Sequence, residues 1–263
     1  ITGAVGTVAP GFDVSGEGRF FIKVPGGSKL APSFSVHGLE VRWQRPDITD
    51  GGATRLFTFL SSGVLIEEST FVADVQHPVP NRYNQGPPAW LFTFGGYPSG
   101  TLEDITLLDN HLESRNWYTT GVSTVYSAMR LENIQLTKNR IKGLHGGFYL
   151  INCHDCLVAR NRLFRVSWGN IVASGERIQI EDNQLLFPGN GTSGDGITLG
   201  SVVDTTIMGN QIINGSCYGI ALREATRLTI KSNLITHDVS SAIFIHGVQG
   251  KTNDVLIEEN HFA

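Results

Sequence analysis

The sequence predicts an all-β protein, a single-stranded parallel β-helix, from three observations. Asparagines recur from residue 110 onward in steps of 29, 22, 22, 27, 23 and 27 residues. Apolar residues stand five and three positions before each asparagine and two after it, with Thr205 as the one polar exception. A repeat of about 20 to 50 residues indicates a solenoid in which each repeat forms one coil. The asparagines are Asn110, Asn139, Asn161, Asn183, Asn210, Asn233 and Asn260.

Each coil is expected to contain three short strands. Before the asparagine, apolar residues two apart alternate with polar ones, as Leu228 and Ile230 do around Thr229, which is the period of a strand with one buried face. The asparagine is expected at a bend, because Asn tolerates the left-handed backbone conformation and stacked amides can bond along a ladder. A second strand, a variable loop and a third strand follow. The third strands are expected at residues 147–150, 196–199, 219–222 and 242–245.

The repeat extends upstream of residue 110, but there other residues stand in the asparagine position. Val64 to Ile66 lead to Ser69 in the asparagine position, and Leu39 and Val41 lead likewise to Gln44. Residues 13–24 indicate one earlier coil. No Pro/Gly/Ser linker divides the chain and the sequence stops in mid-coil, so we expect residues 1–263 to form one β-helix domain of a longer chain.

Composition narrows the class of protein further. The chain has 31 glycines and 17% charged residues, so it is turn-rich and lightly charged. A net charge of −4 argues against general nucleic-acid binding. No apolar run approaches the length of a membrane span. No cofactor is expected, and no compact Asp/Glu cluster of the kind that Ca²⁺ requires is present.

The sequence Cys153-His154-Asp155-Cys156 has the spacing of half a zinc site. Cys156, however, falls in an apolar position of the repeat, five before Asn161. We therefore expect Cys156 to be buried and without a ligand, with a metal or redox role as the alternative. We also expect no disulfide to Cys153, because the bond would span a turn of three residues while Cys156 points into the core.

The repeats resemble the right-handed parallel β-helix of the pectate-lyase-like superfamily, and Gly16-Glu17-Gly18-Arg19 resembles a phrase common in its early coils. The resemblance covers about residues 10–263. That superfamily includes polysaccharide lyases, galacturonan hydrolases, uronate epimerases and trimeric phage tailspike depolymerases. It implies a right-handed helix, a polysaccharide ligand and a location outside the cell, on the cell surface or on a virion. The aspartate-rich signatures of the hydrolases and the Asp-Pro-His motif of the epimerases are missing, so the reaction is not specified.

Three irregular loops connect second strands to third strands and are expected to rise on one side of the rod: 72–88, 113–122 and 186–194. Arg, Trp and Tyr stack on sugar rings and bind hydroxyls or carboxylates. The alternative is that Trp117 and Tyr118 cover core or make a subunit contact. The candidate substrate-binding residues of these loops are Arg82, Tyr83, Arg115, Trp117 and Tyr118.

The third strands provide a second set of candidates. If Ile197, Leu199 and their equivalents point inward, the alternate residues point outward on successive coils, roughly 5 Å apart. The alternative for each is an ordinary solvated surface residue. The candidate catalytic residues are Arg223, His246, Tyr218, Asp195 and His145, and the candidate substrate-binding residues are Tyr149 and Phe244.

The first functional hypothesis is an enzyme that degrades polysaccharide. For β-elimination at a uronic acid, Arg223 would neutralise the carboxylate, while Tyr218, His246 or His145 would serve as base or acid. Hydrolysis requires two carboxyl groups flanking the bond.

Asp195 has no evident carboxylate partner on its face, although Asp74 or Glu113 could extend over it from the loops. This shortage favours elimination over hydrolysis. Two further hypotheses remain open. One is a non-catalytic glycan-binding or virion-spike module, and the other is a structural rod that packs as a homotrimer, as the tailspike resemblance implies.

Overall fold

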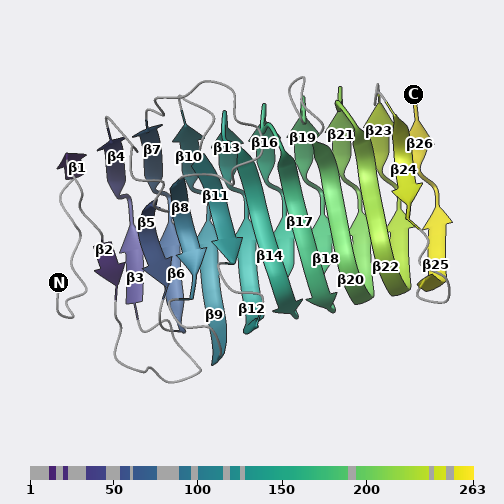
Figure 1. Ribbon diagram of the computed structural model, residues 1–263, viewed down its shortest axis with the longest axis horizontal. Helices are drawn as coiled ribbons and strands as arrows, with labels where there is room; N and C mark the ends of the chain where they lie inside the picture. The colour runs from purple at the N-terminus through teal and green to yellow at the C-terminus, as the bar shows by residue number, and fades with distance from the viewer. Residues whose placement is uncertain are drawn as a thin grey trace.

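The computed structural model describes residues 12–15, 20–22, 34–45, 54–59, 62–75, 89–95, 100–114, 119–124, 128–188, 194–236, 240–246 and 252–263. These residues form strands that stack along one axis into a rod, with β1 and β26 at opposite ends of the stack (Figure 1). Every pairing between neighbouring strands is parallel. The prediction of a right-handed parallel β-helix is confirmed. Within the described ranges no helix is long and apolar enough to cross a membrane.

One sheet collects the short strands that follow the asparagine positions. It has ten strands in sequence order. They are β1 (Phe12–Ser15), β4 (Glu40–Arg45), β7 (Thr70–Val75), β10 (His111–Ser114), β13 (Arg140–Lys142), β16 (Arg162–Phe164), β19 (Gln184–Leu186), β21 (Gln211–Ile213), β23 (Leu234–Thr236) and β26 (His261–Phe262).

The other sheet has sixteen strands and combines the predicted first and third strands. The third strands are β2 (Phe20–Ile22), β5 (Thr54–Phe59), β8 (Ala89–Phe94), β11 (Thr119–Thr124), β14 (Gly146–His154), β17 (Gly169–Glu176), β20 (Asp195–Met208), β22 (Tyr218–Lys231) and β24 (Ser241–Ile245). The first strands are β3 (Phe34–His37), β6 (Val64–Glu67), β9 (Gly100–Leu108), β12 (Met129–Thr137), β15 (Leu157–Ala159), β18 (Gln179–Glu181) and β25 (Thr252–Glu258). In β20 and β22 the third strand continues without a break into the first strand of the next coil. One left-handed residue, Asp204 in β20 and Arg227 in β22, turns the chain there, and the pairing of β20 with β22 continues on both sides of it.

The core consists of the columns that the repeat predicts. In the six coils from Asn110 to Asn233, the residues five before, three before and two after the asparagine are buried. Ile257 and Phe262 lie at the end of the stack and are exposed. The sequence interpretation missed one further inward column, eight residues before the asparagine, which includes Leu102, Leu131 and Val202.

The asparagine ladder is confirmed. The amide nitrogen of Asn161, for example, donates to the Oδ1 atom of Asn183 at 2.9 Å and to the carbonyl oxygen of Leu136 at 2.7 Å. The same pattern repeats from Asn110 to Asn260. The left-handed residue, however, is the one before the asparagine, such as Lys138 or Arg160, rather than the asparagine itself. The asparagine side chain points inward, where its amide satisfies backbone groups that the bend leaves unpaired.

Upstream, one assignment is confirmed and one is wrong. Ser69 occupies the ladder position, because its N–H donates to Oδ1 of Asn110 at 3.0 Å. Gln44 does not occupy it: Val41 pairs with Phe71, so the equivalent residue is Leu39, whose N–H donates to Oγ of Ser69 at 3.0 Å. Leu39 could not be recognised from the sequence as a ladder residue, because its side chain is apolar.

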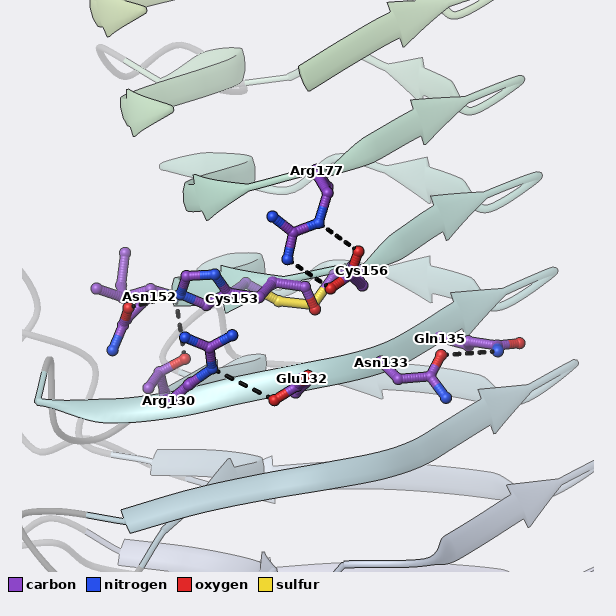
Figure 2. The surroundings of a disulfide bond; sticks show 12 residues. Arg130, Glu132, Asn133, Gln135, Asn152, Cys153, Cys156 and Arg177 are labelled. Carbon is purple, nitrogen blue, oxygen red and sulfur yellow. Dashed lines mark hydrogen bonds and ion pairs between the residues drawn. A yellow bond between two sulfur atoms is a disulfide. The ribbon is translucent and has the colours of Figure 1, made fainter. Parts of the chain in front are cut away.

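The prediction about the cysteines is half wrong. Cys156 is buried as expected, but a disulfide joins it to Cys153, with 6.2 Å between the Cα atoms (Figure 2). Cys153 belongs to the missed inward column. The left-handed Asp155 turns the chain between the two cysteines, so both side chains point inward. Gly175 stacks on Cys153 in that column, and a Cβ at Gly175 would lie 2.0 Å from the Cys153 carbonyl oxygen.

We expect the disulfide to be measurable in solution. Unfolded without reductant, the protein should be alkylated at Cys217 alone, and after reduction at all three cysteines. Because the bond closes a loop of four residues, chain entropy predicts that Cys153→Ser/Cys156→Ser lowers the free energy of unfolding by about 2 kcal/mol. Chemical denaturation with Cys217→Ser as the control checks this. Alkylation of three cysteines before reduction would contradict the disulfide.

Candidate functional site

A groove of about 780 Å³ lies on the outer face of the third strands, across β14, β17, β20 and β22. These strands are adjacent in the sixteen-stranded sheet, so residues of four successive coils line one surface. Its polar and aromatic lining includes Tyr149, Asn152, Trp168, Asp195, Thr198 and Arg223.

Tyr149 lies against two glycines. A Cβ at Gly146 would come within 2.5 Å of the Tyr149 ring, and a Cβ at Gly169 would lie 2.8 Å from its hydroxyl oxygen. Gly146 and Gly169 pair with each other in β14 and β17, and at these two positions the absence of a Cβ leaves room for the ring. Burial raises the pKa of the Tyr149 phenol, and the Asp195 carboxylate acts in the same direction. Tyr149 is therefore protonated at neutral pH.

Asp195 occupies the next place in the column of Gly146 and Gly169. Its Oδ2 atom accepts a hydrogen bond from the Thr198 hydroxyl at 2.9 Å, and its Oδ1 atom accepts one from the Tyr218 N–H at 3.4 Å. The Cys217 side chain also hydrogen-bonds to Asp195. Burial raises the pKa of this thiol, and the negative charge of Asp195 raises it further. The carboxylate is thus fixed in one orientation with acceptor capacity left for a ligand.

Arg223 and Trp168 are the large exposed side chains of the lining. Arg223 follows the inward Leu222 in β22, and it forms no ion pair with another described residue. Trp168 stands directly before β17 with 51% of its surface exposed. Its ring stacks on His145, with 5.7 Å between the centroids. A free cation and an exposed aromatic ring on one face can hold an acidic sugar.

His145 supports Trp168 and contributes no surface to the groove. Its Nδ1 atom lies 3.4 Å from the Ser167 hydroxyl, and burial lowers the pKa of the imidazole. His145 is therefore neutral at neutral pH.

Tyr218, Phe244 and His246 form a separate aromatic group. Tyr218 stacks on Phe244 with 4.4 Å between the ring centroids, and Phe244 contacts His246 edge-on at 6.2 Å. All three face outward on the coils after Asp195, and none of them lines the groove. The candidate residues of the third strands thus fall into two groups. Asp195, Arg223 and Tyr149 lie together in the groove, and the others lie outside it.

The loop candidates Arg82, Tyr83, Arg115, Trp117 and Tyr118 lie outside the described residues. The suggested carboxylate partners for Asp195 are placed elsewhere. Asp74 lies in β7 and Glu113 in β10, both in the ten-stranded sheet. Glu113 lies 3.1 Å from His111 and 3.1 Å from Lys142. Burial acts to raise the pKa of Glu113, but the hydrogen bonds and charges of His111 and Lys142 together lower it below its usual value. Glu113 is therefore engaged away from the groove.

Sequence reasoning missed Trp168, Asn152 and the glycine column. Trp168 has a signal in the repeat, because it occupies the position directly before a third strand that His145 and Cys217 occupy in their coils. Asn152 has none, since its left-handed φ of 57° is a property of the corner that leads to the disulfide.

The fold and the groove define a class: a right-handed parallel β-helix with a ligand-sized groove on one face. Residues 103–263, more than half of the chain, match the family model described as "Periplasmic copper-binding protein (NosD)". The chain therefore belongs to the NosD family. None of the curated proteins matches the sequence.

Several solved structures share the fold at low identity. The A-module of mannuronan C-5 epimerase AlgE6 from Azotobacter vinelandii is 11% identical with a TM-score of 0.45, covering 97% of this chain and 89% of that chain. GH136 lacto-N-biosidase from Eubacterium ramulus is 10% identical with a TM-score of 0.43, covering 89% and 63%. Tailspike protein 3 of bacteriophage CBA120 is 11% identical with a TM-score of 0.36, covering 95% and 52%. At these TM-scores the likenesses carry no argument about activity.

Proposed function

We propose that the protein binds an acidic polysaccharide in the groove and cleaves it by β-elimination at a uronic acid. The observation that carries the proposal is the convergence of Arg223, Asp195 and Tyr149 on one groove beside the exposed Trp168. Elimination requires a cation for the uronate carboxylate, a base for the proton at C5 and an acid for the leaving oxygen.

Each of these roles has a suitable group. Arg223 is the cation, because its guanidinium is exposed and unpaired among the described residues. Tyr149 is the acid, because its phenol lies in the groove lining and is protonated at neutral pH. Asp195 is the base, held by the hydrogen bonds from Thr198 and Tyr218. Hydrolysis is less well supported, since Asp195 is the one carboxylate residue in the described lining of the groove.

Incubation with a panel of acidic and neutral polysaccharides tests the proposal. Elimination should produce unsaturated uronate absorbance together with new reducing ends. Reducing ends without that absorbance would indicate hydrolysis. Binding of one glycan without either product would favour the second candidate function, a non-catalytic binding module, for which the stacked Trp168 is a sufficient platform.

The family description raises the question of copper. Among the described residues no group of three or more His, Cys, Asp or Glu side chains gathers around one point. Cys153 and Cys156, the adjacent pair of soft ligands, are bonded to each other. The described residues thus do not fit a copper centre of that kind, and the proposed reaction involves none.

We also propose a location outside the cytoplasm. A disulfide persists in oxidising compartments such as the periplasm and the extracellular space. The printed family description, which says periplasmic, agrees with this proposal.

The glycine beneath Tyr149 allows a specific test of the groove. Gly169→Ala should weaken glycan binding several-fold, because the new Cβ would displace the Tyr149 hydroxyl and the Val172 side chain. Stability should fall by only about 1 kcal/mol, since the tyrosine can rotate outward. Titration of glycan by calorimetry and a thermal melt measure the two effects. Tyr149→Phe is the matched variant: it keeps the ring, so it should bind normally and cleave slowly. Unchanged binding by Gly169→Ala would remove Tyr149 from the site.

A further inference from the structure

Charged residues on this rod ordinarily face an opposite charge on the next coil. Arg177 donates two hydrogen bonds to Asp155, at 2.6 and 2.7 Å (Figure 2). Arg227 binds Asp204 in the same two-pronged way two coils further on. Lys231 and Glu258 lie 2.8 Å apart on successive coils. Stacking of opposite charges is thus the rule for the neighbouring coils of this chain.

Two positions on the coils of β13 and β16 depart from this pattern. Arg140 pairs in register with Arg162. Lys138 and Arg160 occupy equivalent positions directly before Asn139 and Asn161, both left-handed, with φ of 58° and 57°. All four side chains are exposed, and within the described ranges none forms an ion pair. We call these four residues the cationic stack.

Like charges in adjacent strands repel at a spacing of about 4.8 Å and destabilise the pairing. A solvated surface could carry them singly, but here two pairs coincide on the same two coils. The overall charge of the chain is −4, so four cations on two adjacent coils depart from the average, although Asp109 and Asp182 occupy the position of Lys138 and Arg160 on the flanking coils. Arg165 on the same coil adds a further exposed cation, 5.2 Å above the ring of Phe164.

We propose that the cationic stack binds an acidic polysaccharide, as a second contact surface on the ten-stranded sheet, separate from the groove. Arginine guanidinium groups bind carboxylates and sulfates with two parallel hydrogen bonds. Cations that repeat from coil to coil match anions that repeat along a polymer. The choice of a glycan rests on the proposed function, whereas the binding of a polyanion does not. Nucleic acid is disfavoured by the net charge and by the disulfide, which indicates a compartment where acidic glycans are the ordinary polyanions.

The test measures polygalacturonate binding by the whole chain at low and moderate salt. Arg140→Gln/Arg162→Gln should weaken binding about tenfold at low salt and flatten its salt dependence. The matched control, Arg42→Gln/Lys231→Gln, removes the same charge from two ion-paired sites outside the cationic stack, exposed Arg42 and half-buried Lys231, and should bind as the wild type does. A thermal melt of each variant confirms folding.

Equal loss in both double variants would show a net-charge effect and overturn the proposal. Absence of wild-type binding at low salt would overturn it as well. Duplex DNA bound as tightly as the glycan, with the same dependence on Arg140 and Arg162, would replace the glycan by nucleic acid. The groove is tested separately. If Arg223→Ala leaves binding intact and no glycan is cut, but Arg140→Gln/Arg162→Gln still weakens binding, the proposed function fails while the second surface holds.

Discussion

Replacing Asn183 by alanine should lower the free energy of unfolding by about 3 to 4 kcal/mol, because several buried polar groups lose their partners at once. The amide nitrogen of Asn183 donates to the Val158 carbonyl at 2.8 Å and to Asn210 at 2.9 Å. Its Oδ1 atom accepts from both the backbone and the side-chain nitrogen of Asn161, each at 2.9 Å. No water reaches the site to replace these bonds, since Asn183 is fully buried.

Chemical denaturation measures this effect, with Gln184→Ala as the control. Gln184 is the next residue, exposed in β19, and its truncation should change the stability by less than about 0.5 kcal/mol. Asn183→Asp separates hydrogen bonding from packing. It keeps the shape but replaces the donating nitrogen by oxygen, so it should destabilise nearly as much as alanine. A loss below about 1 kcal/mol in both variants would mean that packing, rather than the ladder, sets the register.

The sequence predicts the parts of this fold that repeat with side chains of one kind. The columns before and after the asparagines contain apolar residues in almost every coil, so period and buried face were both visible. The column eight before the asparagine was not, because Cys153 and Gly175 interrupt it. That omission made the disulfide seem geometrically excluded. Leu39 was missed for the related reason that an apolar residue stands where the pattern required a polar one.

The groove was predictable only in part. Arg223 follows from strand alternation, which places it outward once Leu222 is inward. Asp195 does not follow from it, because Asp195 stands two before the inward Ile197; it faces outward because Gly196 takes the inward position next to Ile212. The space that the Tyr149 ring occupies depends on glycines in two neighbouring coils. Only the register of β14 and β17 brings these glycines together. Tyr218 and His246 also face outward, but they stack around Phe244 instead of converging on the groove.

Replacing Arg223 by alanine should abolish turnover of an acidic glycan, at least a hundredfold in kcat/KM, because no described cation of the groove lining can take its place. The melting temperature should stay within a few degrees, since an exposed outward side chain contributes little to the core. Arg223→Lys tests geometry: it keeps the charge but loses the two-pronged contact, so it should retain a small part of the activity.

The Arg223 prediction is tested more strictly by comparing the cleavage of acidic glycans with that of esterified or neutral glycans. If Arg223 neutralises a uronate carboxylate, esterified or neutral glycans should already be poor substrates for the wild type, and Arg223→Ala should affect them little. Arg42→Gln, an exposed arginine three strands from β13 in the ten-stranded sheet, should cut every substrate as the wild type does. A uniform loss over acidic and neutral glycans would assign Arg223 to general binding. Normal cleavage of the acidic glycan by Arg223→Ala would make the groove cation ordinary surface, and the proposed elimination would then lack the charge that it needs to acidify C5.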